Sequence, residues 1–371
     1  MSEGIIAVQA TAPRYLKGAV DNTIRNRLWL AMLKKHNRIK TGDHGAVSLT
    51  WDVEFSEPEI RQNGDAGQQV FTEHDAYRQL TIDVRGYVGT DRLTLKKKLM
   101  NDSPLAIVNL YDRKLPKLIK SMTNNFGNEL YIDGYATGNG NRLIGMESFL
   151  GDDGNTVAAD LVANPSDTYA DRSTALAALG GTWSSGLGSG NYPNATIATD
   201  WPYGQGTSEY DYIAPKLINY TSSSWPTGSI LWRDNCSAVM RRARTWCKSV
   251  GGEGRAPYCH MLSPELYDAF EDYQEDKFRT VVPHKSSQDL GFEDTLNFNG
   301  AAVKHEFDVP AGVGYGLNLN EMLLSSIHDD FFYSFGPEWD TKSLSYLYLV
   351  GFFGNIRFSS PKHFAKYAAY A

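Results

Sequence analysis

A long apolar segment near the C-terminus constrains this chain more than any other feature. Residues 344–364 read LeuSerTyrLeuTyrLeuValGlyPhePheGlyAsnIleArgPheSerSerProLysHisPhe, and aromatic and β-branched residues dominate before a Ser-Pro stop. This composition is typical of a strand. A strand this apolar promotes aggregation unless another element or subunit covers it. The sequence therefore predicts either that the strand closes a hydrophobic core within its own chain, or that the protein packs against copies of itself.

The composition bounds the class of protein. With 371 residues, 42% of them hydrophobic and 21% charged, the chain is globular and long enough for two domains or one core with a large extension. It has no run of 18 apolar residues and no secretory signal, so we expect no contact with a membrane. Cys236, Cys247 and Cys259 lack C-x-x-C spacing and are expected to be reduced thiols in a cytoplasmic protein.

The charge is unevenly distributed. Residues 1–40 carry eight Lys or Arg residues against Glu3 and Asp21, a net charge of +6 in a chain whose net charge is −7. Apolar residues at helical spacing over 16–33 predict a short basic amphipathic helix here. The basic residues form either a solvated helix face or an arm that docks on an acidic neighbour or a polyanion. The overall acidity argues against a dedicated nucleic-acid binder.

Two segments with strict alternation predict a long β-hairpin. Residues 47–55 and 80–84 alternate apolar and polar side chains around a polar tip that contains glycine. The acidic residues Glu54, Glu57, Glu59 and Asp65 surround Arg61 in and beside this tip. A two-stranded hairpin is marginally stable alone in water, so we expect it to need a partner surface.

The strongest helical pattern covers residues 104–132. Ser103-Pro104 provides an N-cap and a proline at the first helical position, and apolar residues then repeat at intervals of three and four. Pro116 falls inside this helix and should kink it or split it in two. A helix of this length can serve as the spine of a flattened molecule.

The rest of the chain predicts loops followed by an α+β domain. Residues 134–229 are loop-like, and 180–210 is expected to be a surface loop. A strand at 230–232, a helix at 234–250, a strand at 258–262, a helix from Pro264 and strands near 300–309 and 315–327 follow. Arg241, Arg242 and Arg244 are interpreted as a solvated helix face, or alternatively as a contact with an acidic patch of a neighbouring subunit.

No motif in the sequence supports catalysis or a cofactor. The glycine-rich runs near 186–190 and 312–316 lack dinucleotide spacing, and no zinc or serine-hydrolase motif is present. His328, Asp329 and Asp330 are adjacent, and neighbouring strand residues point to opposite faces, so a surface turn is the better interpretation than a metal site. We therefore predict no catalytic, cofactor-binding or metal-binding residues.

Taken in order, the parts resemble the major capsid proteins of tailed bacteriophages, which have the Hong Kong 97-like fold. The resemblance is carried by the hairpin at 47–85, the helix at 103–132, Ile144GlyMetGluSerPheLeu150, Asn299GlyAlaAlaValLysHisGluPheAspValPro310, Tyr315GlyLeuAsn318 and Gly354AsnIleArgPhe358. It implies an α+β fold with an N-terminal arm (1–46), an E-loop hairpin (47–90), a P-domain (91–151 and 331–371) containing the spine helix and C-terminal strand, and an A-domain (152–330).

The resemblance also implies a structural role. It implies a non-enzymatic subunit that self-assembles as hexamers and pentamers of an icosahedral shell around double-stranded DNA, in a virion assembled in the host cytoplasm. Scaffold, portal and decoration proteins are candidate partners, and the packaged DNA would be contacted non-specifically. The predicted assembly contacts are Arg14, Lys17, Arg25, Arg27, Lys34, Lys35, Glu57, Glu59, Arg61 and Asp65. Residues 51–85 contain no Lys, so the Lys–Asn cross-link of some family members is not expected.

Two alternative functions stay open at this point. Encapsulin-type cellular shells share the fold that the resemblance implies, and they would enclose a protein cargo rather than DNA. Trp183, Trp201, Trp225 and tyrosine-rich loops suggest, alternatively, a carbohydrate-binding or hydrolytic protein, which would need exposed aromatic platforms and paired carboxylates.

Overall fold

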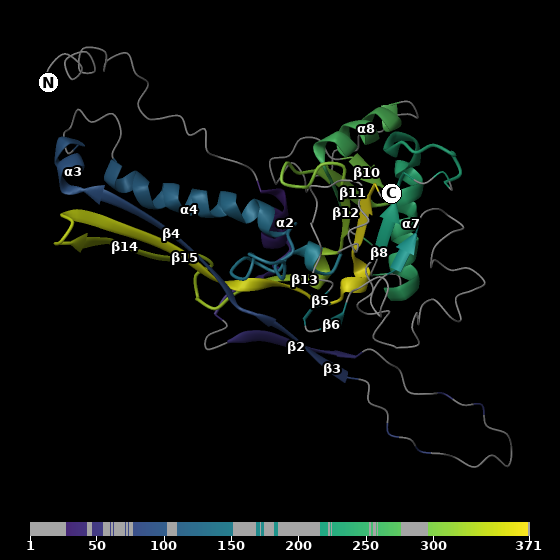
Figure 1. The fold of residues 1–371 in the computed structure, drawn as a ribbon, viewed down its shortest axis with the longest axis horizontal. Helices are drawn as coiled ribbons and strands as arrows, with labels where there is room; N and C mark the ends of the chain where they lie inside the picture. Colours follow the sequence, from purple (N-terminus) through teal and green to yellow (C-terminus); the bar gives the residue numbers. More distant parts are fainter. Residues whose placement is uncertain are drawn as a thin grey trace.

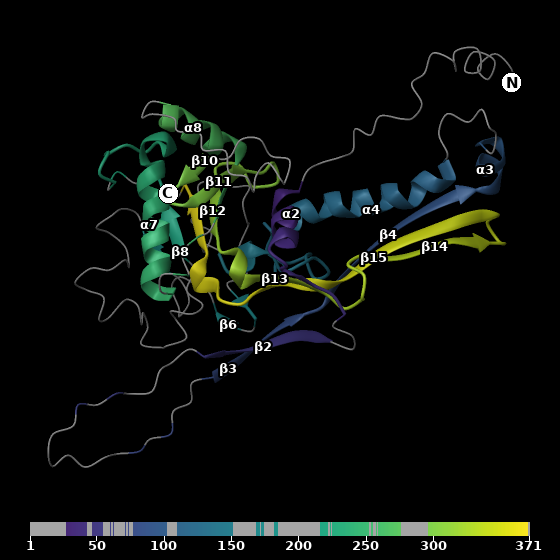
Figure 2. The ribbon, with the colours of Figure 1, turned by 180° about the vertical axis from the view of Figure 1, so that it is seen from behind.

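The computed structural model places two connected bodies, an elongated arm and a broader body with a mixed sheet (Figures 1 and 2). The residues that it describes are 27–42, 47–54, 77–101, 110–150, 168–170, 172–173, 182–184, 216–221, 225–251, 259–275 and 296–369, with the single residues 60, 62, 71, 73, 223, 254 and 257. Among these residues, no helix combines the length and the apolar character that crossing a membrane requires.

The arm is a five-stranded sheet with helices on one side. Its elements are β1 (Ile39–Lys40), β4 (Arg85–Thr94), α3 (Leu95–Asn101), α4 (Leu110–Glu129), β13 (Met322–Ser326), β14 (Tyr333–Asp340) and β15 (Ser345–Phe358). β15 is the predicted C-terminal strand and lies in the middle of the sheet. β4 pairs with one of its edges, β14 and β13 pair with the other, and all three are antiparallel to it. β1 extends the sheet by pairing in parallel with β13.

The helix α4 covers one face of the arm sheet. Because side chains alternate along a strand, Tyr348, Val350 and Phe352 share one face of β15, and all three are buried. The ring of Phe126 on α4 lies 4.8 Å from that of Phe352 in an edge-to-face arrangement. α4 is therefore the predicted spine helix, although the predicted start at Ser103-Pro104 lies outside the described residues.

Pro116 does not split this helix. α4 runs without a break from Leu110 to Glu129 with Pro116 inside it. A proline removes one backbone donor and leaves the carbonyl one turn earlier without its helical partner. Pro116 itself is exposed.

The second body is built on a sheet of seven strands, called here the body sheet. They are β7 (Thr182–Ser184), β8 (Lys216–Asn219), β9 (Cys259–Leu262), β10 (Leu296–Phe298), β11 (Ala301–His305), β12 (Gly314–Leu317) and β16 (Ala365–Ala368), in the spatial order β10-β11-β9-β12-β16-β8-β7. The helices α7 (Trp232–Gly251) and α8 (Pro264–Glu275) pack beside it. Val239, Ala243 and Trp246 of α7 are buried, as their helical spacing predicted.

The three cysteines belong to the interior of the protein. All three are free and buried, which confirms that they form no disulfide. Burial raises the pKa of the Cys247 and Cys259 thiols to about 12 in each case. Since the thiolate is the reactive form, these side chains act as packing residues rather than nucleophiles.

The predicted hairpin is present as a two-stranded ribbon that projects from the arm (Figure 1). β2 (Ser48–Glu54) pairs antiparallel with β3 (Tyr77–Asp83), and Ser48 lies opposite Asp83. Leu49, Leu80 and Ile82 are buried against the chain's own core. The base of the ribbon therefore finds its partner surface within the same chain, whereas most of the tip lies outside the described residues.

The predicted strand before α7 is wrong, and the predicted solvated face of α7 is wrong for Arg242 although Arg241 is exposed. Ile230 and Leu231 form no strand and are each 60% exposed, while Trp232 begins the helix and its indole donates to the carbonyl of Leu266 at 2.9 Å. Arg242 is only 2% exposed, so it does not belong to a solvated face. Its position three residues after the buried Val239 places it on the inner side of the helix, because such residues share a face.

Short elements connect these parts. They are α2 (Leu28–Lys35), the 3-10 helices η2 (Met146–Ser148), η4 (Leu319–Glu321) and η5 (Pro361–His363), and the paired strands β5 (Thr168–Tyr169) and β6 (Arg172–Ser173). η5 follows β15 directly and leads into β16. The C-terminal segment therefore runs through the arm sheet first and then enters the body sheet, between β12 and β8.

A buried ion pair joins the segment after α4 to the body sheet. Lys366 Nζ on β16 lies 2.6 Å from Glu147 Oε2 on η2, and the two side chains are 1% and 0% exposed. Tyr315 on β12 donates a hydrogen bond to the other oxygen of Glu147. Removing a charge from water costs several kcal/mol unless a partner compensates it. The pair therefore fixes where residues 144–150 lie against the body sheet.

Replacing Lys366 by Met should lower the free energy of unfolding by about 3–5 kcal/mol, because Glu147 is left buried without its cation. Urea denaturation of the unassembled chain measures this change. The double variant Glu147→Gln/Lys366→Met is the matched control and should recover a large part of the loss, since it removes both charges. A single variant within about 0.5 kcal/mol of wild type, as expected for an ordinary surface substitution, would contradict the assignment.

Candidate assembly surface

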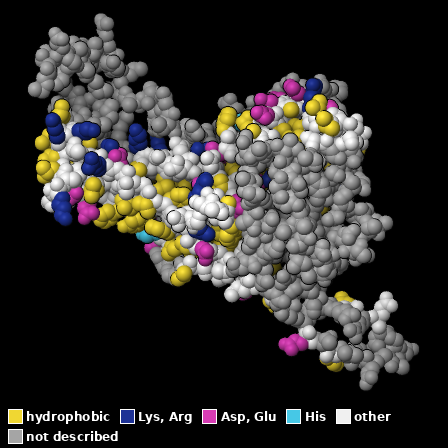
Figure 3. Space-filling view, in the orientation of Figure 1, with side chains coloured by type: hydrophobic (Ala, Val, Ile, Leu, Met, Phe, Trp, Pro, Cys, Tyr) yellow, Lys and Arg dark blue, Asp and Glu magenta, His cyan; other side chains and the backbone are white. Residues whose placement is uncertain are grey.

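The arm sheet leaves its second face uncovered within the chain. Val88, Phe335, Leu347 and Phe353 are 55%, 47%, 39% and 44% exposed. The strand register brings them together on the side away from α4, because Leu347 and Phe353 alternate with the residues that face the helix. Figure 3 shows hydrophobic side chains along the lower edge of the arm. We call this set the open sheet face, and its apolar character marks it as a contact surface.

The tip of the arm carries a second apolar feature. A recess of about 540 Å³ lies between the start of α3 and the turn that precedes β15, and its lining includes Leu99, Met100 and Leu344. These three side chains are 64%, 69% and 58% exposed. Apolar residues at the end of a projecting arm gain stability only if another surface covers them.

The outer strand β14 is protected from uncontrolled strand pairing. It forms one edge of the sheet, and its register with β15 shifts between Phe335 and Glu338. Pro337 lies within this irregular stretch and has no amide hydrogen to donate. A bulge and a proline on an edge strand discourage addition of a further strand. The arm is therefore suited to contacts through side chains of its sheet face rather than through its edge.

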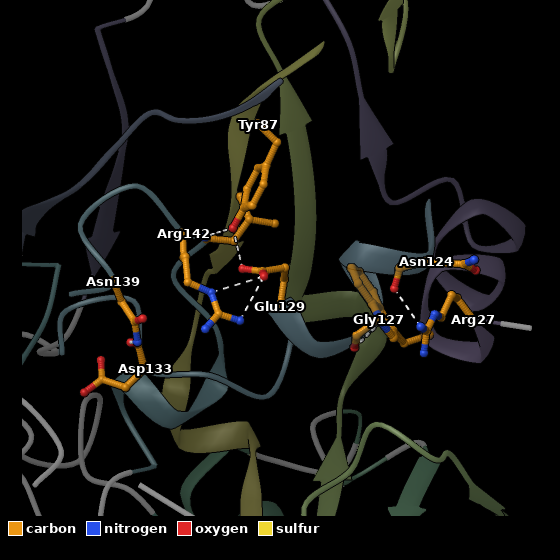
Figure 4. Close-up of polar contacts among 10 residues, drawn as sticks. Arg27, Tyr87, Asn124, Gly127, Glu129, Asp133, Asn139 and Arg142 are labelled. Carbon is orange, nitrogen blue, oxygen red and sulfur yellow. Dashed lines mark hydrogen bonds and ion pairs between the residues drawn. The ribbon is translucent and has the colours of Figure 1, made fainter. Parts of the chain in front are cut away.

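The root of the arm is fixed by a polar network at the end of α4 (Figure 4). Glu129 accepts a hydrogen bond from Tyr87 of β4, and Arg142 donates to it through Nε at 3.2 Å and Nη2 at 3.0 Å. The Tyr87 hydroxyl in turn accepts a bond from the amide of Leu143 at 2.8 Å. Burial, together with the neighbouring Glu129 carboxylate, raises the pKa of Tyr87. These contacts tie helix, strand and following loop together, so the arm is presented in one orientation.

Of the predicted assembly contacts, the structure describes three. Arg27 is buried, pairs with Asp308 and donates to the carbonyl of Asn124 at 2.6 Å, so it is engaged within the chain. Lys34 and Lys35 lie exposed at the end of α2. Their role in contacts between subunits stays a prediction. The others lie outside the described residues: Arg14, Lys17, Arg25, Glu57, Glu59, Arg61 and Asp65.

The N-terminus of α2 is held by a buried carboxylate. Glu306 accepts a hydrogen bond from the Leu28 amide at 3.2 Å and another from the Tyr131 hydroxyl at 2.7 Å. The amide belongs to the first turn of α2, whose donors have no partner within the helix. Burial raises the pKa of Glu306 to about 7, although these hydrogen bonds and Arg27 act in the opposite direction.

Sequence reasoning missed the buried charges because it looked for exposed ones. Glu147 and Glu306 both lie in segments that carried the family resemblance, yet neither was identified as a site residue. A usable signal was present: Glu147 stands inside IleGlyMetGluSerPheLeu, and Lys366 stands between Phe364-Ala365 and Tyr367-Ala368. A lone charge of each sign within an apolar run predicts a buried pair.

The alternative sites considered from the sequence are not favoured where the structure describes them, whereas Trp201 and the side chain of Trp183 lie outside the described part of the chain. Trp225 is 2% exposed and its indole donates to the carbonyl of Asn219 at 2.8 Å, so it is no platform for a sugar ring. The Asp330 amide donates to His328 Nδ1 at 3.0 Å in an exposed turn, as the surface-turn interpretation predicted. Within the described part of the chain, no group of three or more His, Cys, Asp or Glu residues is placed to hold a metal ion.

Comparison with known proteins relates the whole described architecture to capsids. No protein-family model and no curated protein matches the sequence. The capsid of cyanophage A-1(L) superposes with a TM-score of 0.60 at 11% identity, covering 96% of this chain and 97% of that one. The capsid of the empty GTA particle gives 0.54 at 11%, and that of Myoviridae phage XM1 gives 0.52 at 10%, each covering 96% of both chains. The chain therefore has an α+β fold shared with phage capsid proteins, which confirms the resemblance at the level of fold.

Glu306 predicts a specific dependence of stability on pH. Its carboxyl ionises near 4.5 when unfolded and near 7 when folded. Between these values Glu306 binds more protons in the folded state, so its contribution to the free energy of unfolding should fall as pH rises and level off above about 7. The full loss is roughly 3 kcal/mol.

Urea denaturation between pH 4.5 and 8 measures this decrease, with Glu306→Gln as the comparison because glutamine still accepts the Leu28 amide bond. The variant should lose the decrease. His260 and His36, whose pKa values are lowered mainly by burial, add a rise with pH in both proteins. This rise offsets the decrease in wild type and cancels in the difference between the two profiles. Identical pH profiles for wild type and variant would show that Glu306 is not the group responsible.

Proposed function

We propose that this chain is the major capsid protein of a tailed phage, a structural subunit of the Hong Kong 97-like type that self-assembles into an icosahedral shell around double-stranded DNA. The observation that carries the proposal is the open sheet face, Val88, Phe335, Leu347 and Phe353, on a rigidly held arm. A soluble chain that exposes such a face is incomplete by itself. The fold shared with phage capsid proteins also supports the proposal.

The proposed assembly is a closed array of copies. Many weak contacts in a symmetric shell give high avidity, so no single interface has to be strong. The arm with its open face, the apolar recess at its tip and the projecting ribbon offer three separate surfaces for such contacts. The subunits would form hexamers and pentamers, and catalysis has no part in this function.

The division into domains follows the resemblance. We propose residues 1–46 as the N-terminal arm, 47–90 as the E-loop, 91–151 with 331–371 as the P-domain, and 152–330 as the A-domain. Strand pairing supports two refinements: β4 pairs along β15 in the arm sheet, and β16 pairs with strands of the body sheet. The location would be the virion, with assembly in the host cytoplasm. Scaffold, portal and decoration proteins are proposed partners.

Electron microscopy of purified protein under assembly conditions tests this function directly. Closed particles of uniform diameter are expected, and particles from an infected host should contain DNA. A chain that stays monomeric at high concentration under all assembly conditions would overturn the proposal. Particles that enclose a specific protein instead of DNA would indicate the alternative, an encapsulin-type compartment.

Leu347→Asp should raise the concentration needed for assembly while leaving the subunit folded, because it places a charge on the open sheet face. A loss of about 2 kcal/mol per contact corresponds to a roughly thirtyfold weaker contact, which raises the concentration needed for assembly accordingly. Light scattering against concentration measures the threshold, and circular dichroism checks the fold. Leu347→Met is the matched control and should assemble like wild type. Equal thresholds for both variants would exclude this face from the assembly contacts.

A further inference from the structure

Two opposite charges flank the open sheet face near the outer end of the arm, where β15 begins (Figure 1). Arg92 on β4 and Glu338 on β14 both stand opposite Leu347 of β15 in the strand register. Residues that stand directly opposite each other in a ladder point to the same face of the sheet. Arg92, Leu347 and Glu338 therefore form one row across the open sheet face, and all three side chains are exposed.

The preceding residues confirm the direction in which this row points. Asp91, which precedes Arg92, is paired with a lysine of α4 at 2.7 Å. Tyr346, which precedes Leu347, accepts a hydrogen bond from a lysine of α3 at 3.1 Å. Because successive residues of a strand point to opposite faces, Arg92 and Leu347 point away from both helices, and the register carries Glu338 to the same side.

The apolar residues of the open sheet face lie further along the arm on the same side. Phe335 stands opposite Leu349, and Val88 stands opposite Gly351. Figure 3 shows side chains of both charges beside the hydrophobic ones toward the outer end of the arm. The face therefore has an apolar middle, with a positive residue toward the β4 edge and a negative residue toward the β14 edge.

These two charges distinguish between the ways in which two copies can pack face to face with their strands aligned. If the strands run parallel, a twofold axis between the sheets lies along β15 and exchanges the two edges. Arg92 of each copy then meets Glu338 of the other. If the strands run antiparallel, the axis lies across them and each edge meets its own counterpart. Arg92 would then face Arg92, and Glu338 would face Glu338, so repulsion disfavours this arrangement.

We propose that the open sheet face binds the open sheet face of a second copy about a twofold axis along β15, with Leu347 meeting Leu347 at the centre. This inference rests on the proposed function and names the arrangement in which one of its assembly contacts forms. A twofold interface uses the same surface on both partners, so that surface has to be complementary to itself. One apolar residue between two opposite charges on the two edges meets this requirement.

The contact is expected to be weak by itself. A stable interface buries about 800 Å² on each partner, whereas the open sheet face offers four partly exposed apolar side chains. An exposed ion pair changes an equilibrium constant by only about a factor of 2, but it favours one orientation over the others. Such a contact is suited to a closed array in which many copies of it form together.

Charge reversal in two separate variants tests the proposal. Arg92→Glu and Glu338→Arg each turn the two attractions of the interface into two repulsions. At about a factor of 2 per pair, the contact should weaken about 16-fold in either variant. Light scattering should therefore show a higher concentration needed for assembly. An equimolar mixture of the two variants should assemble near the wild-type concentration, because each copy supplies the charge that the other requires.

Two further proteins serve as controls. Lys117→Glu changes the net charge as Arg92→Glu does, but lies on the exposed side of α4 and should assemble like wild type. The double variant Arg92→Glu/Glu338→Arg exchanges the two charges within one chain and should also assemble like wild type. Circular dichroism checks that every variant is folded.

Several results would overturn the inference. Recovery in the double variant without recovery in the mixture would show that Arg92 and Glu338 act within one chain. An equal effect of Lys117→Glu would mean that only net charge matters. Wild-type behaviour of both charge-reversal variants would exclude these residues from the contact.

Chemical cross-linking tests the centre of the interface without requiring complete particles. The native cysteines are buried, so a short bis-maleimide should react at Leu347→Cys and join two copies in concentrated solution. Lys117→Cys is the control on the opposite side of the arm and should yield fewer joined copies. Equal yields at both positions would contradict the proposed pairing.

The same proteins separate this inference from the proposed function. Chains that cross-link through Leu347→Cys and respond to the charge exchange, but never form particles, would refute the shell and retain the paired face. Particles that form equally well in all charge-reversal variants would retain the shell and refute the pairing.

Discussion

The structure depends on the pairing of β15 along both of its edges. β4 pairs with one edge, and β14 followed by β13 pairs with the other. An apolar strand that would promote aggregation if its edges were exposed therefore lies in the middle of a sheet. At the point where β13 meets it, Gly354 leaves no room for a side chain, since a Cβ there would overlap the carbonyl of Ser325. With its edges satisfied, the strand has only its two faces left to bury, and α4 buries one of them.

How far the sequence predicts this arrangement depends on whether a signal is local. The strand β15, the β2–β3 ribbon, the spine helix and the inner sides of α7 and α8 follow from periodicity, because burial of one face imposes a period of two or 3.6. Ile230 and Leu231 were misread since three apolar residues fit a strand and a helix entrance equally well. The partners of β15 could not be predicted, because strand order is decided by contacts between residues far apart in the chain. The open sheet face could not be predicted from the sequence for the same reason. Val88 and Phe335 come onto one face only through the register of β4, β15 and β14.

The burial of charged residues is equally hard to predict from the sequence. Arg27 reads as one of a row of basic residues, yet it is buried beside Asp308 and bonded to the end of α4. Glu147 and Lys366 are far apart in sequence and form the most buried ion pair among the described residues. Net charge over a segment identifies where a polyanion or an acidic neighbour can bind, but burial of an individual charge depends on the fold.

The continuity of the C-terminal segment has a mechanical consequence. β15 spans the arm and leads through one turn of 3-10 helix into β16, which lies between two strands of the body sheet. A pull along the arm would load the ladders of β4, β13 and β14 in shear, with many hydrogen bonds resisting together rather than opening one after another. Such a force would pass along a single backbone path into the interior of the other sheet. The two bodies would thus behave as one tension-bearing unit when a container built from them is stretched from within.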